Sequence, residues 1–191
     1  MTGDGGEILS AGFSPNGKLA VTASADRTAR VWNAVTGDEA PTLVGHDNAV
    51  TRAVFSPDGL YILTESEKKS ARLWDVRTET EISRLNCIGS TEKFAVFSPD
   101  SKRIAGFCAD EMLHFWNVKT GAETAQPIAG DWMAISPDLA HAVERLNNVE
   151  AALRDTMTGA VIKTLDHSNF WAFGAAKFSA DGTFVMTETS G

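Results

Sequence analysis

The chain has 191 residues, of which 43% are hydrophobic and 22% charged, a composition typical of one soluble globular domain or one run of repeats. The formal net charge is -8 and no block of lysine or arginine occurs, so a nucleic-acid-binding surface is not predicted. No apolar run is long enough for a membrane helix, so we expect no membrane partner, and the N-terminal stretch shows no secretory signal. The two cysteines, Cys87 and Cys108, are too few for a disulfide scaffold, so we expect a reducing, cytoplasmic location.

A turn motif recurs along the whole chain. FSPNG begins at Phe13, FSPDG at Phe55, FSPDS at Phe97, ISPDL at Ile135 and FSADG at Phe178. A second position follows each of the first four motifs after 19 residues, and it holds Trp32, Trp74, Trp116 and Arg154. A block of fixed length, joined by connections of variable length, indicates one folded unit that is repeated.

Short apolar segments bounded by turn residues predict β-strands throughout the repeat. The first strand of each repeat is predicted at 7–13, 49–55, 90–97, 132–135 and 173–178. Second strands are predicted at 17–24, 103–107 and 183–187, third strands at the tryptophan position, and a fourth strand at 41–44. The sequence Ser-Pro-Asp-Gly favours a β-turn, and this turn separates the first strand from the second.

Four short strands in each repeat, without a helical run, predict one antiparallel sheet per repeat. Such a sheet is marginal alone, but radial stacking covers both of its faces. The sequence therefore predicts an all-β protein: a β-propeller of four-stranded antiparallel blades, with about four blades plus half of a fifth.

The repeats resemble the WD-repeat β-propeller family, in the form found in bacteria. The resemblance rests on RVWN, RLWD and HFWN around the three tryptophans, on Gly45-His46, and on the phased FSPDG turns. It implies a single WD-repeat segment over 1–191, with blades at about 7–45, 46–86, 87–129 and 130–166 and a partial blade at 167–191. The implied ring is open or incomplete, which is expected of a piece of a longer propeller protein or of an arc that completes itself by association.

The resemblance also implies a buried tetrad in each blade, formed by a histidine, a hydroxyl, an aspartate and the tryptophan. Blade 1 has Asp26 and Trp32 but no histidine, blade 2 has His46 and Trp74 but Lys68 at the aspartate position, and blade 3 has Asp110 and Trp116. No blade has all four groups, so we expect packing to contribute more to stability than this network does.

Blade 4 departs from the pattern at two positions. Arg154 replaces the tryptophan, and Glu144 stands ten residues earlier, where blades 1 and 2 have a threonine. The connection that precedes this blade is also shortened. We predict a cross-strand Glu144–Arg154 ion pair in place of a Thr–Trp pair.

No catalytic, cofactor or metal site is predicted. The four histidines have no metal-ligand spacing, and the serines of the FSPDG motif recur as turn residues. The alternative is a propeller-based enzyme of lactonase or hydrolase type, but the predicted first strands are mostly apolar.

The predicted function is that of a protein–protein interaction scaffold, part of a larger signalling or regulatory protein. Its expected partners are other proteins or peptides, a second copy, or the remaining blades of a longer chain. Residues on the rim formed by the loops between blades are the predicted binding residues. They are Trp132, Phe170, Trp171, Arg27, Lys68 and Asp131. The other interpretation of the aromatic residues is that they fill space between blades.

Overall fold

The computed structural model describes residues 5–40, 42–67, 70–85, 95–108, 112–124, 128–166 and 173–189. Within these ranges every regular element is a β-strand. The predicted all-β class is therefore confirmed. None of the described residues belongs to a helix that could span a membrane.

The described strands form four antiparallel sheets of four strands each and a fifth sheet of two strands. Blade 1 consists of β1 (Ile8–Phe13), β2 (Leu19–Ser24), β3 (Thr28–Asn33) and β4 (Leu43–Val44). Blade 2 consists of β5 (Val50–Phe55), β6 (Tyr61–Ser66), β7 (Ala71–Asp75) and β8 (Glu81–Leu85). Blade 3 consists of β9 (Val96–Phe97), β10 (Arg103–Phe107), β11 (Met112–Asn117) and β12 (Ile128–Ala129). Blade 4 consists of β13 (Asp131–Ile135), β14 (His141–Arg145), β15 (Glu150–Asp155) and β16 (Val161–Asp166), and the partial blade 5 of β17 (Phe173–Phe178) and β18 (Val185–Thr189).

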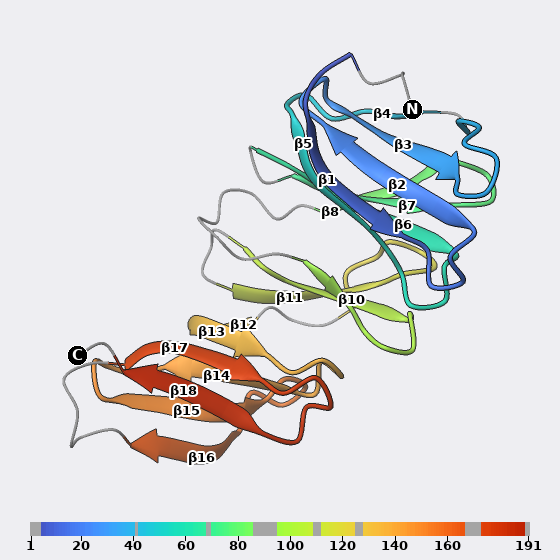
Figure 1. Ribbon diagram of the computed structural model, residues 1–191. Coiled ribbons are helices and arrows are strands. Elements are labelled where there is room, and N and C mark those ends of the chain that lie inside the picture. The colour runs from blue at the N-terminus through green and yellow to red at the C-terminus, as the bar shows by residue number, and fades with distance from the viewer. Residues whose placement is uncertain are drawn as a thin grey trace.

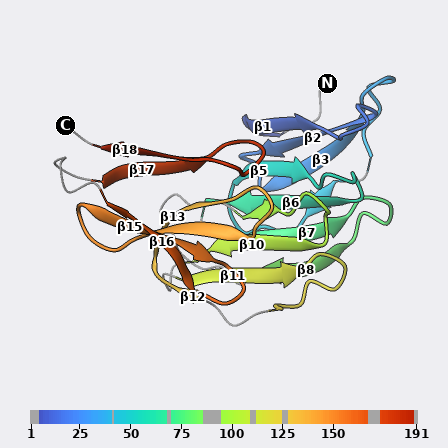
Figure 2. The ribbon, with the colours of Figure 1, turned by 90° about the horizontal axis from the view of Figure 1, so that it is seen from below.

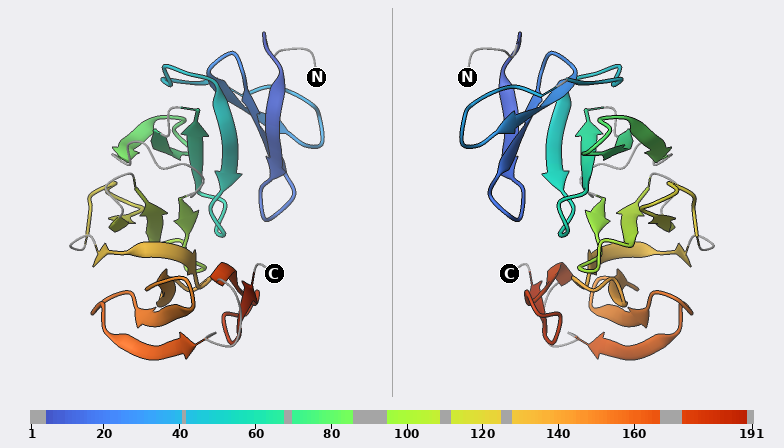
Figure 3. Two further views of the ribbon diagram at one scale, coloured as in Figure 1. Left: turned by 90° about the vertical axis from the view of Figure 1, so that its left-hand side faces the viewer. Right: turned by 90° about the vertical axis from the view of Figure 1, so that its right-hand side faces the viewer.

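The sheets follow one another in chain order as the blades of an incomplete propeller. β1 lies beside β5 and β13 lies beside β17, so first strands of neighbouring blades are adjacent (Figure 1). Blades 1 to 3 stack face against face when seen from below (Figure 2). Figure 3 shows an open arc with the blue N-terminal sheet at one end and the red C-terminal sheet at the other.

The meander of each blade gives the arc two distinct rims. Consecutive strands are neighbours in every sheet. The turns between first and second strands and between third and fourth strands therefore lie on one rim, called here the turn rim. The turns between second and third strands lie on the opposite rim with the connections between blades, and this is called the loop rim.

The recurring turn motif closes the first hairpin of each blade. In blade 2, Ser56 Oγ donates to Asp58 Oδ1 at 2.6 Å and accepts from the Tyr61 N–H at 3.0 Å. Gly59 follows with a φ of 74°, which glycine adopts without strain. Leu139 occupies the same place in blade 4 with a φ of 61°, and its side chain is fully buried between blades. Burial of this side chain offsets the backbone strain there.

The hydrophobic core lies between the blades. Trp74 of blade 2 is buried in a cluster with Val21 and Val31 of blade 1. Trp116 of blade 3 is buried in the next cluster, with Leu63 of blade 2. Burying one large apolar side chain stabilises a fold by roughly 1.5–3 kcal/mol, so stacking of the blades provides the core.

Most strand positions agree with the sequence prediction, and β10 and β17 have the predicted bounds. The predicted strand 183–187 is shifted, because β18 begins at Val185. The Phe184 carbonyl accepts from the Ser179 N–H at 2.9 Å and so belongs to the turn. Of the predicted first strand of blade 3, only β9 is described, and residues 90–94 lie outside the described residues.

One of the two cysteines forms a disulfide in the structure. Cys108 is disulfide-bonded, and only 6% of its surface is exposed. The sequence has one other cysteine, Cys87, which lies outside the described residues. A low cysteine count excludes a dense disulfide scaffold but does not exclude a single bridge.

Candidate functional site

Two of the residues that the sequence predicted to bind a partner lie on the loop rim, Arg27 and Asp131. Arg27 lies in the turn between β2 and β3, and Asp131 is the first residue of β13. Both side chains are exposed, and Arg27 has a φ of 76°. Lys68, Phe170 and Trp171 lie outside the described residues. Arg27 and Asp131 therefore share a rim, but they belong to blades 1 and 4.

Trp132 does not lie on the surface, and its assignment as a binding residue is wrong. Its side chain is 1% exposed and lies in a cluster with Leu113, Phe115 and Leu139. Strand residues alternate between the two faces of a sheet, and the Trp132 face is covered by blade 3. Trp132 thus fills space between blades, which was the alternative interpretation of the aromatic residues.

Arg145 is a loop-rim residue that was not predicted from the sequence. Its Nε lies 3.8 Å from Asp131 Oδ2, and its Nη2 donates to the Gly174 carbonyl at 3.3 Å. The side chain therefore joins blade 4 to β17. No signal in the sequence distinguishes this arginine, because the matching position of blade 2 holds Glu65.

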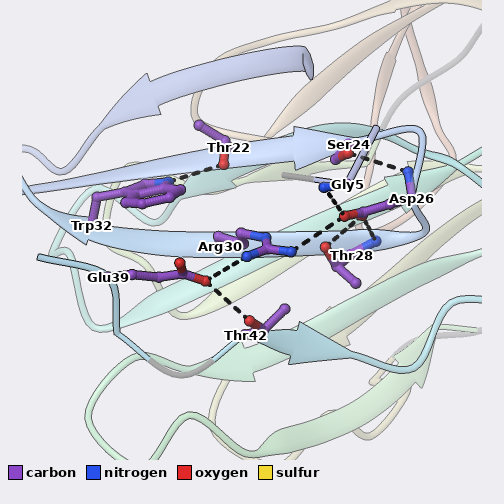
Figure 4. Close-up of polar contacts among 9 residues, drawn as sticks. All are labelled: Gly5, Thr22, Ser24, Asp26, Thr28, Arg30, Trp32, Glu39 and Thr42. Carbon is purple, nitrogen blue, oxygen red and sulfur yellow. Dashed lines mark hydrogen bonds and ion pairs between the residues drawn. The ribbon is translucent and has the colours of Figure 1, made fainter. Parts of the chain in front are cut away.

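A chain of polar contacts crosses blade 1 around Asp26 (Figure 4). Asp26 Oδ1 accepts from the Thr28 hydroxyl at 2.6 Å, and Oδ2 accepts from the Gly5 N–H at 3.1 Å and from Arg30 Nη2 at 3.4 Å. Arg30 Nη1 in turn donates to Glu39 Oε1 at 2.8 Å. Burial raises the pKa of Asp26, but the hydrogen bonds from Thr28 and Gly5 outweigh it, and the pKa lies below its ordinary value.

The tryptophan of blade 1 bonds to the residue that the WD-repeat resemblance implies. Trp32 Nε1 donates to Thr22 Oγ1 at 3.0 Å, and both side chains are buried (Figure 4). This contact is separate from the Asp26 chain among the contacts drawn. Blade 1 therefore has the Thr–Trp half of the tetrad and uses its aspartate for other partners.

Blade 2 has a continuous polar network, in which the resemblance implied the histidine, the threonine and the tryptophan but not the two serines. Trp74 Nε1 donates to Thr64 Oγ1 at 2.8 Å, and Thr64 Oγ1 lies 2.7 Å from His46 Nε2. His46 Nδ1 lies 3.2 Å from Ser70 Oγ, which is 2.9 Å from Ser66 Oγ. A serine hydroxyl thus takes the place of the aspartate carboxylate. Packing alone does not account for this blade.

His46 is held neutral by its surroundings. Burial and the nearby Arg72 guanidinium lower the pKa of His46 from 6.5 to about 4. Arg72 is itself buried, and it donates to the Gly45 carbonyl and to Glu81 Oε2. A charged imidazole would therefore face a fixed cation at close range.

A contact between a basic side chain of the third strand and a glutamate of the segment that follows it recurs in the first three blades. The basic residue and the glutamate are nine residues apart, a spacing that is visible in the sequence but was not predicted to mark a contact. The pairs are Arg30–Glu39, Arg72–Glu81 and His114–Glu123. In blade 4 the same positions hold Ala152 and Val161, so this pair is lost.

Blade 3 keeps the tryptophan without a threonine partner. Trp116 is 4% exposed, and its ring stacks on His114 with centroids 5.7 Å apart and planes at 13°. A Cβ at Gly106 would lie 3.1 Å from Trp116 Cζ3, so the indole fills the space of the missing side chain. Asp110, predicted for the tetrad of this blade, lies outside the described residues.

The predicted ion pair of blade 4 is confirmed. Arg154 Nε donates to Glu144 Oε2 at 2.5 Å, and Arg154 Nη1 donates to the Gly159 carbonyl at 2.7 Å. The two charged side chains are 24% and 12% exposed. A Cβ at Gly130 would lie 2.7 Å from Glu144 Oε1, so the glutamate occupies space beside the shortened connection.

The polar groups of the blades mostly bind one another. Ser56, Ser98 and Ser136 each donate to the aspartate two residues ahead, which is a turn-closing contact. In the described ranges no group of three or more histidine, cysteine, aspartate or glutamate side chains could hold a metal ion. The arrangement can therefore hold the blades rigid and present the loops between them.

Comparison with known families gives a match to the first two repeats. The family model described as "WD domain, G-beta repeat" (WD40) matches residues 1–33 and 37–75, which cover blade 1 and β5 to β7 of blade 2. The chain has no significant match among curated proteins. The resemblance drawn from the sequence motifs is thus confirmed.

Proposed function

We propose that this chain, a member of the WD-repeat family, is a protein–protein interaction scaffold that binds its partner through the loop rim. WD40 repeats generally mediate protein–protein interaction. The supporting observation is that one set of side chains holds the blades together and a different set faces the solvent. The buried tryptophans and the repeated ion pairs hold the blades, whereas Arg27 and Asp131 on the loop rim stay exposed. Loop residues on a rigid scaffold are the usual place for recognition.

The part of this rim over blades 4 and 5 is the proposed contact surface. Leu146, in the turn between β14 and β15, is 44% exposed, and the Asp131–Arg145 pair lies on the same rim. Phe170 and Trp171 belong by sequence to the connection that enters β17. An apolar side chain, an arginine and aromatic residues are typical anchors of protein interfaces.

The proposed setting is a larger cytoplasmic signalling or regulatory protein. Self-association of the arc is a further proposal. Light scattering tests it, because a particle of twice the chain mass supports a second copy as partner and a monomer contradicts it.

A cross-linking pull-down with mass spectrometry tests the proposed binding surface. The Phe170→Ala/Trp171→Ala variant should lose the partner at least about tenfold, since two aromatic anchors together contribute more than about 1.4 kcal/mol. The matched control is Val35→Ala/Met157→Ala on the turn rim, where both side chains are more than three-quarters exposed, at 84% and 80%. Equal recovery by the loop-rim variant, with its fold intact by circular dichroism, would overturn the proposal.

A further inference from the structure

We propose that the outer edge of blade 4, strand β16, is a strand-addition site that binds an extended segment of another protein. The segment pairs with β16 through backbone hydrogen bonds and adds a further antiparallel strand to the sheet. This surface runs along the outside of the arc and differs from the loop rim. The inference therefore goes beyond the proposed function and does not depend on it.

β16 is the outermost strand of the blade 4 sheet. The strand order is β13-β14-β15-β16, and none of the described strands pairs with the far side of β16 (Figure 1). Five of its six residues are exposed. An edge strand presents a row of backbone N–H and C=O groups, with which another extended chain can form a regular ladder. The edge thus selects a β-strand as its ligand.

The outer edges of the first three blades are protected against such pairing, but the outer edge of blade 4 is not. The described strands β4 and β12 have two residues each, and short edges resist pairing. β8 has five residues, but these include Glu81 and Arg84, and the Arg84 side chain is 67% exposed. In blade 4 the glutamate position holds Val161, which is 50% exposed, and the adjacent Ile162 is 52% exposed. A long edge with exposed apolar residues is typical of a surface that another chain covers.

The strand register places the charges of β16 on two different faces. Leu165 lies opposite Ala151 and packs in the cluster between blades 4 and 5. Lys163 is two positions away and shares that face, because side chains alternate along a strand. Asp166 lies on the other face, opposite Glu150. An added strand therefore meets a cation on one face and two carboxylates on the other.

These charges define the chemistry of the partner segment. In an antiparallel added strand, the residue opposite Asp166 should be basic, and the residue opposite Lys163, three positions later, should be acidic. The residue opposite Leu165 should be apolar, because Leu165 lies in an apolar cluster. The partner segment thus reads basic, apolar, any residue and acidic, from its N-terminus to its C-terminus.

A second copy of the chain does not fit this pattern. Two copies of β16 related by a two-fold axis pair antiparallel, and the residues that lie opposite each other then point to the same face. Residues on one face differ by an even number of positions, whereas Lys163 and Asp166 differ by three, so these two never lie opposite each other. Registers centred on either residue place like charges opposite each other instead, which is destabilising. The edge therefore suits a different chain.

A pair of synthetic peptides tests the site. The probe is the fluorescein-labelled peptide STKVTEVS, and the control is STEVTKVS, which has the same composition with the two charges exchanged. Fluorescence anisotropy should show that the wild-type chain binds the probe at least about fivefold more tightly than the control. The Lys163→Glu/Asp166→Lys variant should reverse this preference, whereas Val35→Ala should keep it. No binding of the probe, equal binding of the two peptides, or no reversal in a folded variant would overturn the proposal.

Two N-methylated forms of the probe distinguish strand pairing from charge attraction alone. The N–H groups of an extended peptide point alternately to its two sides, so only one alternate set faces β16. Methylation of that set should abolish binding, and methylation of the other set should leave binding unchanged. Equal effects of the two forms would contradict strand addition.

Two further measurements separate this site from its alternatives. If light scattering shows a dimer that the β16 variant dissociates, a second copy covers the edge and the proposal is wrong. Failure of the probe to bind counts against the strand site alone, because the pull-down with Phe170→Ala/Trp171→Ala tests the scaffold function. Loss of the pull-down partner by that variant, with probe binding intact, supports two separate surfaces.

Discussion

Glu144 and Arg154 occupy in blade 4 the diagonal that Thr22 and Trp32 occupy in blade 1. In both blades the two residues are ten positions apart on neighbouring strands. They do not lie opposite each other in the strand register, so the longer side chain reaches the other residue diagonally across the two strands. The donor nitrogen reaches the acceptor oxygen at 2.5 Å in blade 4 and at 3.0 Å in blade 1. An ion pair thus replaces a neutral hydrogen bond at the same place in the repeat.

The ion pair of blade 4 should contribute more than an ordinary surface pair. Arg154→Ala should lower the free energy of unfolding by about 1–3 kcal/mol, because it leaves a carboxylate only 12% exposed without its cation. A double-mutant cycle with Glu144→Ala should give a coupling energy above about 1 kcal/mol by urea unfolding. The control is Arg84→Ala, whose side chain is 67% exposed and should matter by less than about 0.5 kcal/mol. A coupling energy near zero would contradict the assignment.

Thr64 should be the most sensitive polar residue of the blade 2 network. Its hydroxyl serves both Trp74 Nε1 and His46 Nε2, so Thr64→Val removes two buried contacts and should lower the free energy of unfolding by about 2–4 kcal/mol. Ser70→Ala removes the contact to His46 Nδ1 and should have a smaller effect. Thr36→Val on the exposed turn rim is the matched control. Equal effects of the Thr64 and Ser70 variants would show that the network is not centred on Thr64.

The spacing of residues in the sequence predicted the strands and those contacts that strand pairing within one blade places at a fixed separation. The fixed interval between the turn motif and the tryptophan position gave the strands, and the ten-residue interval gave the Glu144–Arg154 contact. Strand residues that pair across a short turn keep a constant separation, so such contacts can be read from a sequence. The nine-residue pairs such as Arg72–Glu81 belong to the same class and were predictable.

Spacing in the sequence could not predict which side chains are buried or which residues far apart in the sequence contact each other. Alternation along a strand separates two faces, but stacked blades cover both faces, so the burial of Trp132 was not visible. Ser70 bonds to a histidine 24 residues away, and only the folded blade brings the two side chains together. The Arg52–Ala95 contact likewise joins two blades and has no local signal.

His46 should make the protein less stable as the pH falls below neutrality. The folded pKa is about 4, below the ordinary 6.5, so the unfolded chain takes up a proton that the folded chain does not. This stability is fully present above pH 6.5 and is lost as the pH falls from 6.5 towards 4. The loss should be about 2 kcal/mol between pH ~7 and pH ~5.

Urea unfolding of His46→Gln at the same two pH values checks this expectation. The variant should be less stable than the wild type near neutrality, and the difference should narrow by pH ~5. Thr36→Val, which changes no titratable group and lies on the exposed turn rim, is the control and should keep the wild-type pH dependence. Parallel pH profiles of the wild type and the His46 variant would contradict the neutral, buried histidine.

The aspartate carboxylates of the turn motif should make the stability of the fold depend on pH in a more acidic range than His46 does. Hydrogen bonds from the serine two residues earlier lower the pKa values of Asp100, Asp138 and Asp181, the last to about 2. A lowered pKa contributes stability that is present above the ordinary 3.8 and is lost as the pH falls towards the folded value. Acid should therefore weaken these turns below pH 3.8, a range separate from that of His46.

Blade 1 provides the design for testing the turn carboxylates. Asn16 takes the aspartate position there and accepts from Ser14 Oγ at 2.9 Å and from the Lys18 N–H at 3.0 Å, so an amide can close the same turn without a charge. The triple Asp→Asn variant at the three positions should therefore fold, with a lower midpoint of thermal unfolding than the wild type near neutrality. That difference should shrink as the pH falls from about 4 to about 2, because the wild-type carboxylates become protonated while the amides do not titrate. If the two midpoints stay the same distance apart over this range, the turn carboxylates are not responsible for the acid sensitivity.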